Sequence, residues 1–331
     1  MANHTNKWVR ASTGLIFLVL LIAGMGAGHQ FLAEREEADR FPAPGLLVDI
    51  VGRRLHVMCS GSGAPAVLIE ASGLGTALQS AAVQRALATT QRVCSYDRAG
   101  LGWSDPSPYP ATAKAMELDL EQLLARLHLP APLILVASSA GGLPSELYAR
   151  EHPDRVAGLV WVDALSADAL DRVPEIHRLQ RSACLARDAA WLGAIRLLDP
   201  LHLNTADEAL AARNVALTYR RRTLEAVCSL TRSFDESAEQ IRHAPDLKSS
   251  IPAIVLVHGE PRDIDPFASA ADLAQLEPKW RAAQAQFAAR FTGSKLQVVE
   301  HSGHLIVGER PDAVVSAVRD VQGLPATASS N

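Results

Sequence analysis

The chain has 331 residues, of which 48% are hydrophobic and 21% are charged, and its formal net charge is −4. This is the composition of an ordinary globular protein with a buried core, and it excludes a long disordered chain. No long block of lysine and arginine is present, so the sequence has no electrostatic footprint for nucleic acid. The length allows two average domains or one large α/β domain with an insertion.

The first 40 residues have the layout of a targeting segment. Basic Lys7 and Arg10 precede an apolar run, and small and then charged residues follow it. The run itself has the length of a signal-peptide core, whereas residues 11–28 together approach the ~20 residues that span a bilayer. Three interpretations stay open: an uncleaved membrane anchor, a signal peptide cleaved near Ala27 or Gly28, and a buried helix. In the first two, the positive-inside rule leaves the rest of the chain outside the cytoplasm, periplasmic or extracellular.

The chain contains four cysteines, and none of them belongs to a C-x-x-C pair. Zinc ribbons and thioredoxin-type redox chemistry therefore have no support. An even number of cysteines in an exported protein permits two disulfides, and four buried free thiols are the alternative. The four residues are Cys59, Cys94, Cys184 and Cys228.

From residue 46 onward, short β-branched runs alternate with longer amphipathic runs. This alternation predicts a mostly parallel sheet covered by helices, because uninterrupted apolar runs suit strands that are buried on both faces. The predicted strands lie within residues 46–61 (two strands joined at Gly52), 66–73, 92–97, 131–142, 156–164, 251–259 and 295–304. The predicted helices lie at 77–89, 113–127, 273–291 and 311–321.

The stretch 164–250 interrupts this alternation. It is rich in Ala, Leu and Arg, has almost no β-branched runs and predicts several short helices. We expect it to be a helical cap inserted into a core formed by residues 41–163 and 251–323. Residues 1–40 are the N-terminal segment and linker, and the tail 324–331 is expected to be disordered.

The strongest chemical signal is a serine at the point where a buried strand turns directly into a helix. The segment Leu133–Gly142 reads LILVASSAGG, and Ser139 lies at its turn. Such a turn strains its central residue, and only small neighbours let the backbones approach. It lifts the hydroxyl clear of the sheet, where the next helix N-terminus favours negative charge. Ala137 replaces the first glycine of the G-x-S-x-G pattern, and an ordinary loop serine is the alternative to a nucleophile.

Two further segments complete a set of groups for acyl transfer. Upstream, Ser72–Gly75 closes a strand, so the backbone N–H of Leu74 can join that of Ala140 in an oxyanion hole; a plain glycine turn is the alternative. Downstream, His304 follows the last strand, in the chain order that a Ser, acid, His arrangement requires. A neutral imidazole accepts a serine proton near pH 7. Position, not residue type, selects His304 from the 11 histidines of the chain.

With these residues in place, the chain resembles the α/β-hydrolase family from about residue 46 to 322. The segment Arg92–Asp105, RVCSYDRAGLGWSD, is a long and specific match. The resemblance implies an α/β-hydrolase fold with a mostly parallel sheet of about eight strands, helices on both faces, an inserted helical cap over the serine, and hydrolysis through an acyl-enzyme. Asp97 and Arg98 are expected to brace a loop. Members with aspartate at the position of Ser139 are dehalogenases or epoxide hydrolases, so the serine argues against both.

The acid that orients the histidine has three candidates. The usual family spacing places an aspartate three residues after Gly259, where this chain has Arg262. An insertion of one residue makes Asp263 the acid, with Asp265 as the second choice and Asp163, at the end of the sixth strand, as the third. A buried carboxylate is required because it fixes the imidazole tautomer and stabilises the imidazolium.

The resemblance also implies a pairing of the cysteines. Cys59 ends the second strand and Cys94 begins the fourth, and these strands lie side by side and antiparallel in the resembling fold. A disulfide between them is expected, because export would allow it to persist. Cys184 and Cys228 are expected to form the second disulfide.

These residues predict a serine hydrolase, most simply a carboxylic ester hydrolase. Ser139 attacks a carbonyl, His304 moves the proton, and Asp263 orients His304. The N–H groups of Leu74 and Ala140 hold the oxyanion. No cofactor or metal is implied, and the expected partners are a small ester or amide substrate and a membrane.

Two other functions stay open. An aminopeptidase of the proline-iminopeptidase type needs acidic residues in its cap, which Asp235, Glu236 and Glu239 can supply. A catalytically silent binding protein on the same scaffold is favoured by Ala137 and by the irregular spacing of the acid. The complete set of serine, histidine and oxyanion donors argues against the silent protein.

Overall fold

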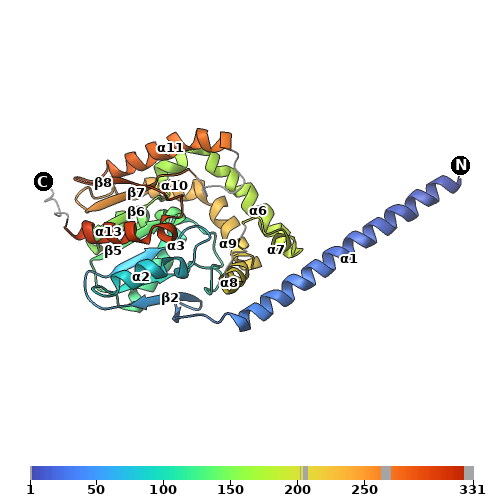
Figure 1. The fold of residues 1–331 in the computed structure, drawn as a ribbon. Helices are drawn as coiled ribbons and strands as arrows, with labels where there is room; N and C mark the ends of the chain where they lie inside the picture. The colour runs from blue at the N-terminus through green and yellow to red at the C-terminus, as the bar shows by residue number, and fades with distance from the viewer. Residues whose placement is uncertain (1, 202, 204–207, 262–269, 324–331) are drawn as a thin grey trace.

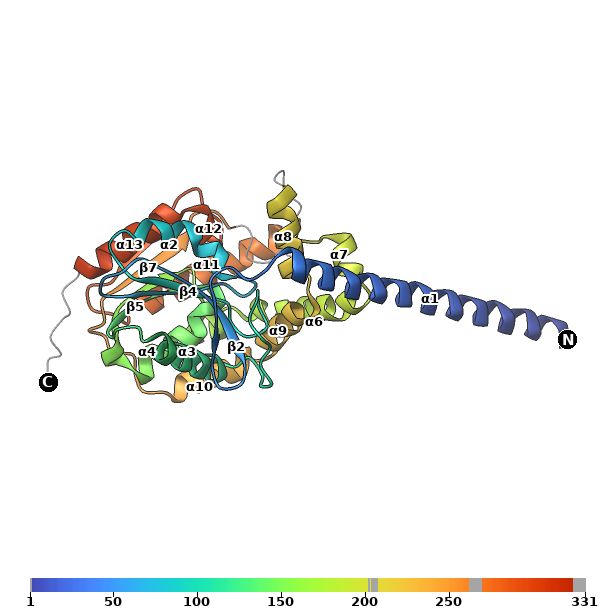
Figure 2. The same cartoon turned by 90° about the horizontal axis from the view of Figure 1, so that it is seen from below.

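The computed structural model describes residues 2–201, 203, 208–261 and 270–323. They form a central sheet between two layers of helices, a group of helices beside it, and a long N-terminal helix that projects from the body (Figure 1). Figure 2 shows the same projection from a second direction. The tail 324–331, predicted to be disordered, lies outside the described residues.

The sheet has eight strands in the described residues, and it is mostly parallel, as predicted. In chain order the strands are β1 (Leu46–Asp49), β2 (Arg54–Ser60), β3 (Val67–Glu70), β4 (Val93–Tyr96), β5 (Leu133–Ser138), β6 (Val156–Val162), β7 (Ala253–His258) and β8 (Lys295–Val299). Across the sheet their order is β1-β2-β4-β3-β5-β6-β7-β8. Only the β1–β2 and β2–β4 pairs are antiparallel among these strands. The α/β-hydrolase fold predicted from the sequence is therefore confirmed.

Helices cover both faces of the sheet because successive strand residues point to opposite sides. In β5, Leu135 packs in a cluster with side chains from three helices, and Val136 packs in a separate cluster on the other face. Relative to an exposed side chain, each such fully buried side chain stabilises the folded state by about 1.5–3 kcal/mol. The helices over the first face are α3 (Ala113–Leu127), α4 (Gly142–Glu151) and α11 (Ala270–Ala288), and those over the second are α2 (Ala81–Leu87), α12 (Ile306–Glu309) and α13 (Pro311–Gly323).

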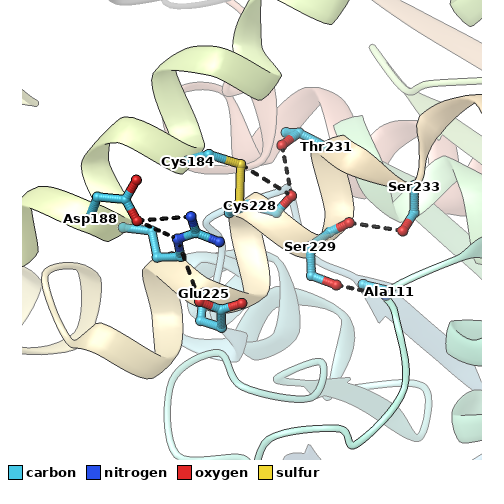
Figure 3. Close-up of a disulfide and its surroundings, with 9 residues drawn as sticks. Ala111, Cys184, Asp188, Glu225, Cys228, Ser229, Thr231 and Ser233 are labelled. Carbon is cyan, nitrogen blue, oxygen red and sulfur yellow. Dashed lines mark hydrogen bonds and ion pairs between the residues drawn. A yellow bond between two sulfur atoms is a disulfide. The ribbon is translucent and has the colours of Figure 1, made fainter.

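A helical insertion connects β6 to β7. Its helices are α5 (Ala167–Arg172), α6 (Arg178–Trp191), α7 (Ala194–Leu198), α8 (Glu208–Thr218), α9 (Arg221–Arg232) and α10 (Phe234–His243). Figure 3 shows how α9 is fastened on two sides. A disulfide joins its Cys228 to Cys184 of α6, and its Ser229 hydroxyl accepts a hydrogen bond of 3.0 Å from the backbone N–H of Ala111 in the core.

The other disulfide, between Cys59 and Cys94, lies in the sheet. Cys59 of β2 and Cys94 of β4 stand directly opposite each other in the antiparallel register, with their Cα atoms 4.1 Å apart. Cross-strand positions of this kind bring two Cβ atoms close enough for a sulfur bridge. Both predicted cysteine pairs are confirmed.

The N-terminal helix, α1 (Ala2–Arg40), has two parts with different surroundings. Its apolar part is long and apolar enough to cross a membrane, and its large hydrophobic side chains from Leu15 to Met25 are exposed. Its last turns pack on the insertion, where the buried Gln30 donates to the carbonyl of Tyr219 at 2.8 Å. The hypothesis of a buried helix is wrong for the apolar part, and a signal anchor or a signal peptide fits it.

Candidate active site

Three side chains meet at the carboxyl edge of the sheet. Ser139 follows β5, Asp163 follows β6 and His304 lies in the loop after β8. Because the carboxyl ends of neighbouring parallel strands lie on one edge, residues distant in the chain converge there. Nε2 of His304 is 2.8 Å from Oγ of Ser139, and its Nδ1 is 2.7 Å from a carboxylate oxygen of Asp163. The distances are those of direct hydrogen bonds.

The backbone around Ser139 has the predicted strain and close packing. Ser139 has a φ of +49°, which places a non-glycine residue in the left-handed region. A Cβ at Gly141 would lie 2.8 Å from the carbonyl oxygen of Ala71, so only glycine fits there. Ala137, in place of the pattern's first glycine, directs its side chain into the core of the first face and is fully buried. The alanine therefore leaves the turn intact.

The two predicted oxyanion donors flank this turn. Ala140 is the second residue of a short 3₁₀ helix, η2 (Ser139–Gly141), where a backbone N–H has no acceptor within the helix. In the described part of the chain, the N–H of Leu74 has no hydrogen-bond partner either. A Cβ at Gly73 would lie 3.7 Å from that of Ala140, so the loop of Leu74 packs directly on the turn.

The segment that carries the family resemblance braces this loop. The guanidinium of Arg98 donates to the carbonyl oxygens of Ala71 at 2.5 Å and Ser72 at 2.6 Å. The buried carboxylate of Asp97 accepts from the N–H of Ala77 at 2.7 Å and from the ring of His56 at 2.8 Å. The expectation that Asp97 and Arg98 brace a loop is confirmed, and the braced loop holds the Leu74 N–H.

The described carboxylate beside His304 is that of Asp163, the third choice from the sequence. It is fully buried, has a φ of +47°, and is fixed by its own N–H, which donates to the carbonyl of Leu256 at 2.8 Å. Asp263 and Asp265 lie outside the described residues. Since Ser139 and Asp163 occupy both ring nitrogens of His304, Asp163 holds the position that Asp263 was predicted to hold.

Three residues around Asp163 were missed by the sequence analysis. Nδ1 of His258, the last residue of β7, is 2.6 Å from the same Asp163 oxygen that His304 contacts, and its Nε2 is 2.8 Å from Glu277 of α11. Trp280, one turn further along α11, donates its ring N–H to the other oxygen at 2.8 Å. The sequence did carry a signal for His258. This residue ends β7, a strand that lies between β5, which leads to Ser139, and β8, which leads to His304.

These contacts set the charges of the site. Burial raises the pKa of Asp163, but hydrogen bonds from His258 and His304 outweigh it and hold that pKa far below its usual range. Burial lowers the pKa of His258, whereas its hydrogen bonds to Asp163 and Glu277 raise it to about 9. At neutral pH the site therefore has an ionised Asp163 beside a cationic His258.

The comparisons with known proteins agree with this architecture. The model of the Alpha/beta hydrolase family matches residues 57–317. The chain belongs to this family. A curated relative of this α/β hydrolase, "Probable transporter efuK" of Hormonema carpetanum, is 35% identical over 136 residues, which cover 39% of the chain and 20% of that protein.

Two solved structures of α/β hydrolases share the fold. The Cif epoxide hydrolase from Acinetobacter nosocomialis has a TM-score of 0.67 and 18% identity, over 89% of this chain and 96% of that one. A malate-bound thermophilic esterase from Thermogutta terrifontis has a TM-score of 0.52 and 22% identity, over 83% and 96% of the two chains. At these identities the likeness concerns the fold alone.

The charged His258 predicts a pH dependence of folding stability. Its pKa rises from 6.5 to about 9 on folding, so its contribution is complete below pH 6.5 and is lost as the pH rises through about 9. We expect the free energy of unfolding of the wild type to fall across this window in urea denaturation under non-reducing conditions. His258→Gln should be less stable at pH 6 and should lack this decline; a decline of equal slope in both proteins would contradict the assignment.

Two groups of side chains in the described residues could be compared with metal sites. Asp163, His258 and His304 have their ligand atoms within 4.8 Å of one another. Their contacts of 2.6 and 2.7 Å are hydrogen bonds, which leave no room for an ion between the same atoms. In the second group, Glu117 already binds Lys114 at 3.0 Å and His152 at 3.2 Å. The first group and the Glu117–His152 pair of the second are therefore explained by hydrogen bonds and ion pairs.

A cavity of about 520 Å³ adjoins the site. Gly73, in the loop of Leu74, lies in its wall, and α9 forms one side with Leu230 and Arg222. Its described wall is mostly apolar but includes charged side chains, and it does not include Ser139 itself. The three acidic residues considered for an aminopeptidase lie on exposed positions of α10 and do not line it: Asp235, Glu236 and Glu239.

Proposed function

We propose that this α/β hydrolase is a serine hydrolase that cleaves carboxylic esters with the triad Ser139, His304 and Asp163. The observation that carries the proposal is the chain of two hydrogen bonds from Ser139 through His304 to Asp163, of 2.8 and 2.7 Å. A serine hydroxyl reacts when a base within hydrogen-bond reach removes its proton and a third group orients that base. Ester cleavage needs nothing beyond these groups.

In the proposed reaction, Oγ of Ser139 attacks the ester carbonyl carbon while its proton passes to Nε2 of His304. The N–H groups of Leu74 and Ala140 stabilise the oxyanion. The C–O bond to the alcohol then breaks, His304 protonates the leaving alcohol, and an acyl-Ser139 ester remains. A water that gives its proton to His304 hydrolyses this ester and frees Ser139. Asp163 stays ionised throughout and stabilises the imidazolium.

We propose that the helical insertion acts as the cap of the substrate site. Its α9 forms a wall of the cavity beside the oxyanion loop, with Leu230 close to Gly73. The disulfide between Cys184 and Cys228 supports this wall because it ties α9 to α6. The volume of the cavity suits a small-molecule ester.

We also propose that α1 is an uncleaved anchor, with the catalytic domain outside the cytoplasm. Lys7 and Arg10 precede its apolar part and acidic residues follow it, which by the positive-inside rule leaves the N-terminus in the cytoplasm. The two disulfides support this location because they persist in oxidising compartments.

The test is labelling of the full chain with a fluorophosphonate probe, followed by an ester panel of increasing acyl length. We expect labelling at Ser139, identified by peptide mass spectrometry, and hydrolysis of at least one class of ester. A chain that is folded but neither labels nor hydrolyses any ester would overturn the proposal. The intact mass of the protein purified from membranes tests the anchor, since cleavage would remove the first 27 or 28 residues.

A further inference from the structure

We propose that the corner between α6 and α7 is a membrane-docking surface, which inserts apolar side chains into the bilayer that α1 crosses. The corner comprises residues 191–198, from the end of α6 to the end of α7. The inference rests on the proposed anchoring of α1, and it deepens the function by assigning a substrate class: esters dissolved in, or drawn from, the membrane.

The corner touches α1 inside its apolar stretch. A Cβ at Gly26 would clash with the carbonyl oxygen of Leu192, and one at Gly193 would lie 2.7 Å from the carbonyl oxygen of Gly26. Gly26 belongs to the stretch 11–28, whose length approaches that of a bilayer span. A helix that crosses the bilayer with this stretch brings the corner to the membrane surface.

The length of α1 also places the corner at the membrane surface. A hydrocarbon core of about 30 Å needs about 20 helical residues. The apolar stretch begins after Arg10, so a span of this length runs from Ala11 to about Gln30. Gly26 then lies within about one helical turn of the bilayer surface, and the corner lies at this level. In both views the α6–α7 corner lies beside the half of α1 that is nearer the body (Figure 1, Figure 2).

The exposed side chains of the corner are of types that bind favourably at a membrane surface. Leu197 and Leu198 are 74% and 76% exposed, and Leu192 is 49% exposed. Trp191 is 56% exposed, and the guanidinium of Arg221 lies 4.7 Å above its ring. Tryptophan prefers the interface between lipid and water, and leucines gain free energy on leaving water. In water alone these side chains would stand exposed side by side.

The corner is held in a fixed orientation to α1. Arg196 of α7 binds Glu37 and lies 3.2 Å from Gln30, and Arg221 at the start of α9 binds Glu34 at 2.9 Å. The disulfide in Figure 3 ties α6 to α9. These contacts come from the charged end of α1, beyond its apolar part, so the corner cannot turn away from the bilayer without breaking them.

Trp191 connects the corner to the active site. It belongs both to the exposed corner and to the wall of the cavity beside the oxyanion loop. An ester with a long acyl chain could therefore pass from the bilayer into the cavity without crossing water. A water-soluble ester would reach the same cavity without the corner.

The depth of Trp191 tests the docking directly. The full chain is reconstituted in phosphatidylcholine nanodiscs with and without bromine on the acyl chains, and the fluorescence of Trp191→Phe is subtracted from that of the wild type. We expect most of the difference signal, which belongs to Trp191, to be lost in the brominated lipid. An intact chain in nanodiscs whose difference signal is unquenched overturns the proposal and leaves the esterase and the anchor standing.

The substrate class is tested with charged variants in the same nanodiscs. Leu197→Asp combined with Leu198→Asp should lower kcat/KM about tenfold for a long-chain ester dispersed in the lipid, since two leucines lose their apolar surroundings. It should leave hydrolysis of a soluble short-chain ester unchanged. The matched control is Leu296→Asp, an exposed leucine on edge strand β8, which should affect neither substrate. Equal rates of lipid-dispersed ester hydrolysis in all three proteins would overturn the proposal, whereas absent soluble-ester hydrolysis in the wild type would overturn the proposed function instead.

Discussion

Ser139→Ala should abolish ester hydrolysis and fluorophosphonate labelling, with a loss in kcat of about 10⁴-fold or more. Loss of the nucleophile in a triad removes the covalent route entirely, and only binding and oxyanion stabilisation remain. The side chain at 139 is small and lies at the end of a 2.8 Å hydrogen bond to His304, so its removal opens no cavity in the core. The measurement is kcat with an activated ester, together with the thermal unfolding temperature.

The neighbouring serine is the matched control. Ser138 is the last residue of β5 and is buried, whereas the Ser139 hydroxyl reaches His304. Ser138→Ala should retain labelling and most of the activity. Full activity in Ser139→Ala, or a loss of equal size in both variants with the fold intact, would refute the assignment of the nucleophile.

The contact between Ser139 and His304 could be predicted because the signals of both residues are local. The small residues around Ser139 report the tight strand-to-helix turn, and the position of His304 after the last strand follows from the order of the chain. The sheet could be predicted for the same reason, since each buried strand is a run of consecutive apolar residues. The cysteine pairing required one more step, the register of β2 against β4.

The carboxylate that lies beside His304 could not be predicted, because several carboxylates follow the strands near this histidine. The spacing rule for the loop after β7 selected Asp263, yet the described carboxylate beside His304 follows β6. The choice depends on the left-handed backbone of Asp163 and on the side chains around it. Two of these, Glu277 and Trp280, come from α11, and nothing in their local sequence distinguishes them from other helix residues.

Asp163→Asn should lower kcat/KM by about 10⁴-fold. An asparagine amide at this position would donate to Nδ1 of His304 and leave a proton on Nε2, the tautomer that cannot accept the proton of Ser139. Because Asp163 also accepts from His258, the variant is checked by thermal unfolding and near-UV circular dichroism. His258→Gln removes this other contact and leaves the bond to His304, so it should keep far more activity than Asp163→Asn.

Variants of Asp263 and Asp265 test whether the catalytic acid lies after β6 or in the loop after β7. Asp263→Asn and Asp265→Asn should each change kcat/KM less than tenfold, since both ring nitrogens of His304 already have partners in Ser139 and Asp163. The four proteins are compared at pH 7 with one soluble ester. If Asp263→Asn loses about 10⁴-fold while Asp163→Asn is mild, the acid belongs to the loop after β7, and the buried Asp163 instead neutralises the His258 cation, a role that would appear in stability and not in the rate.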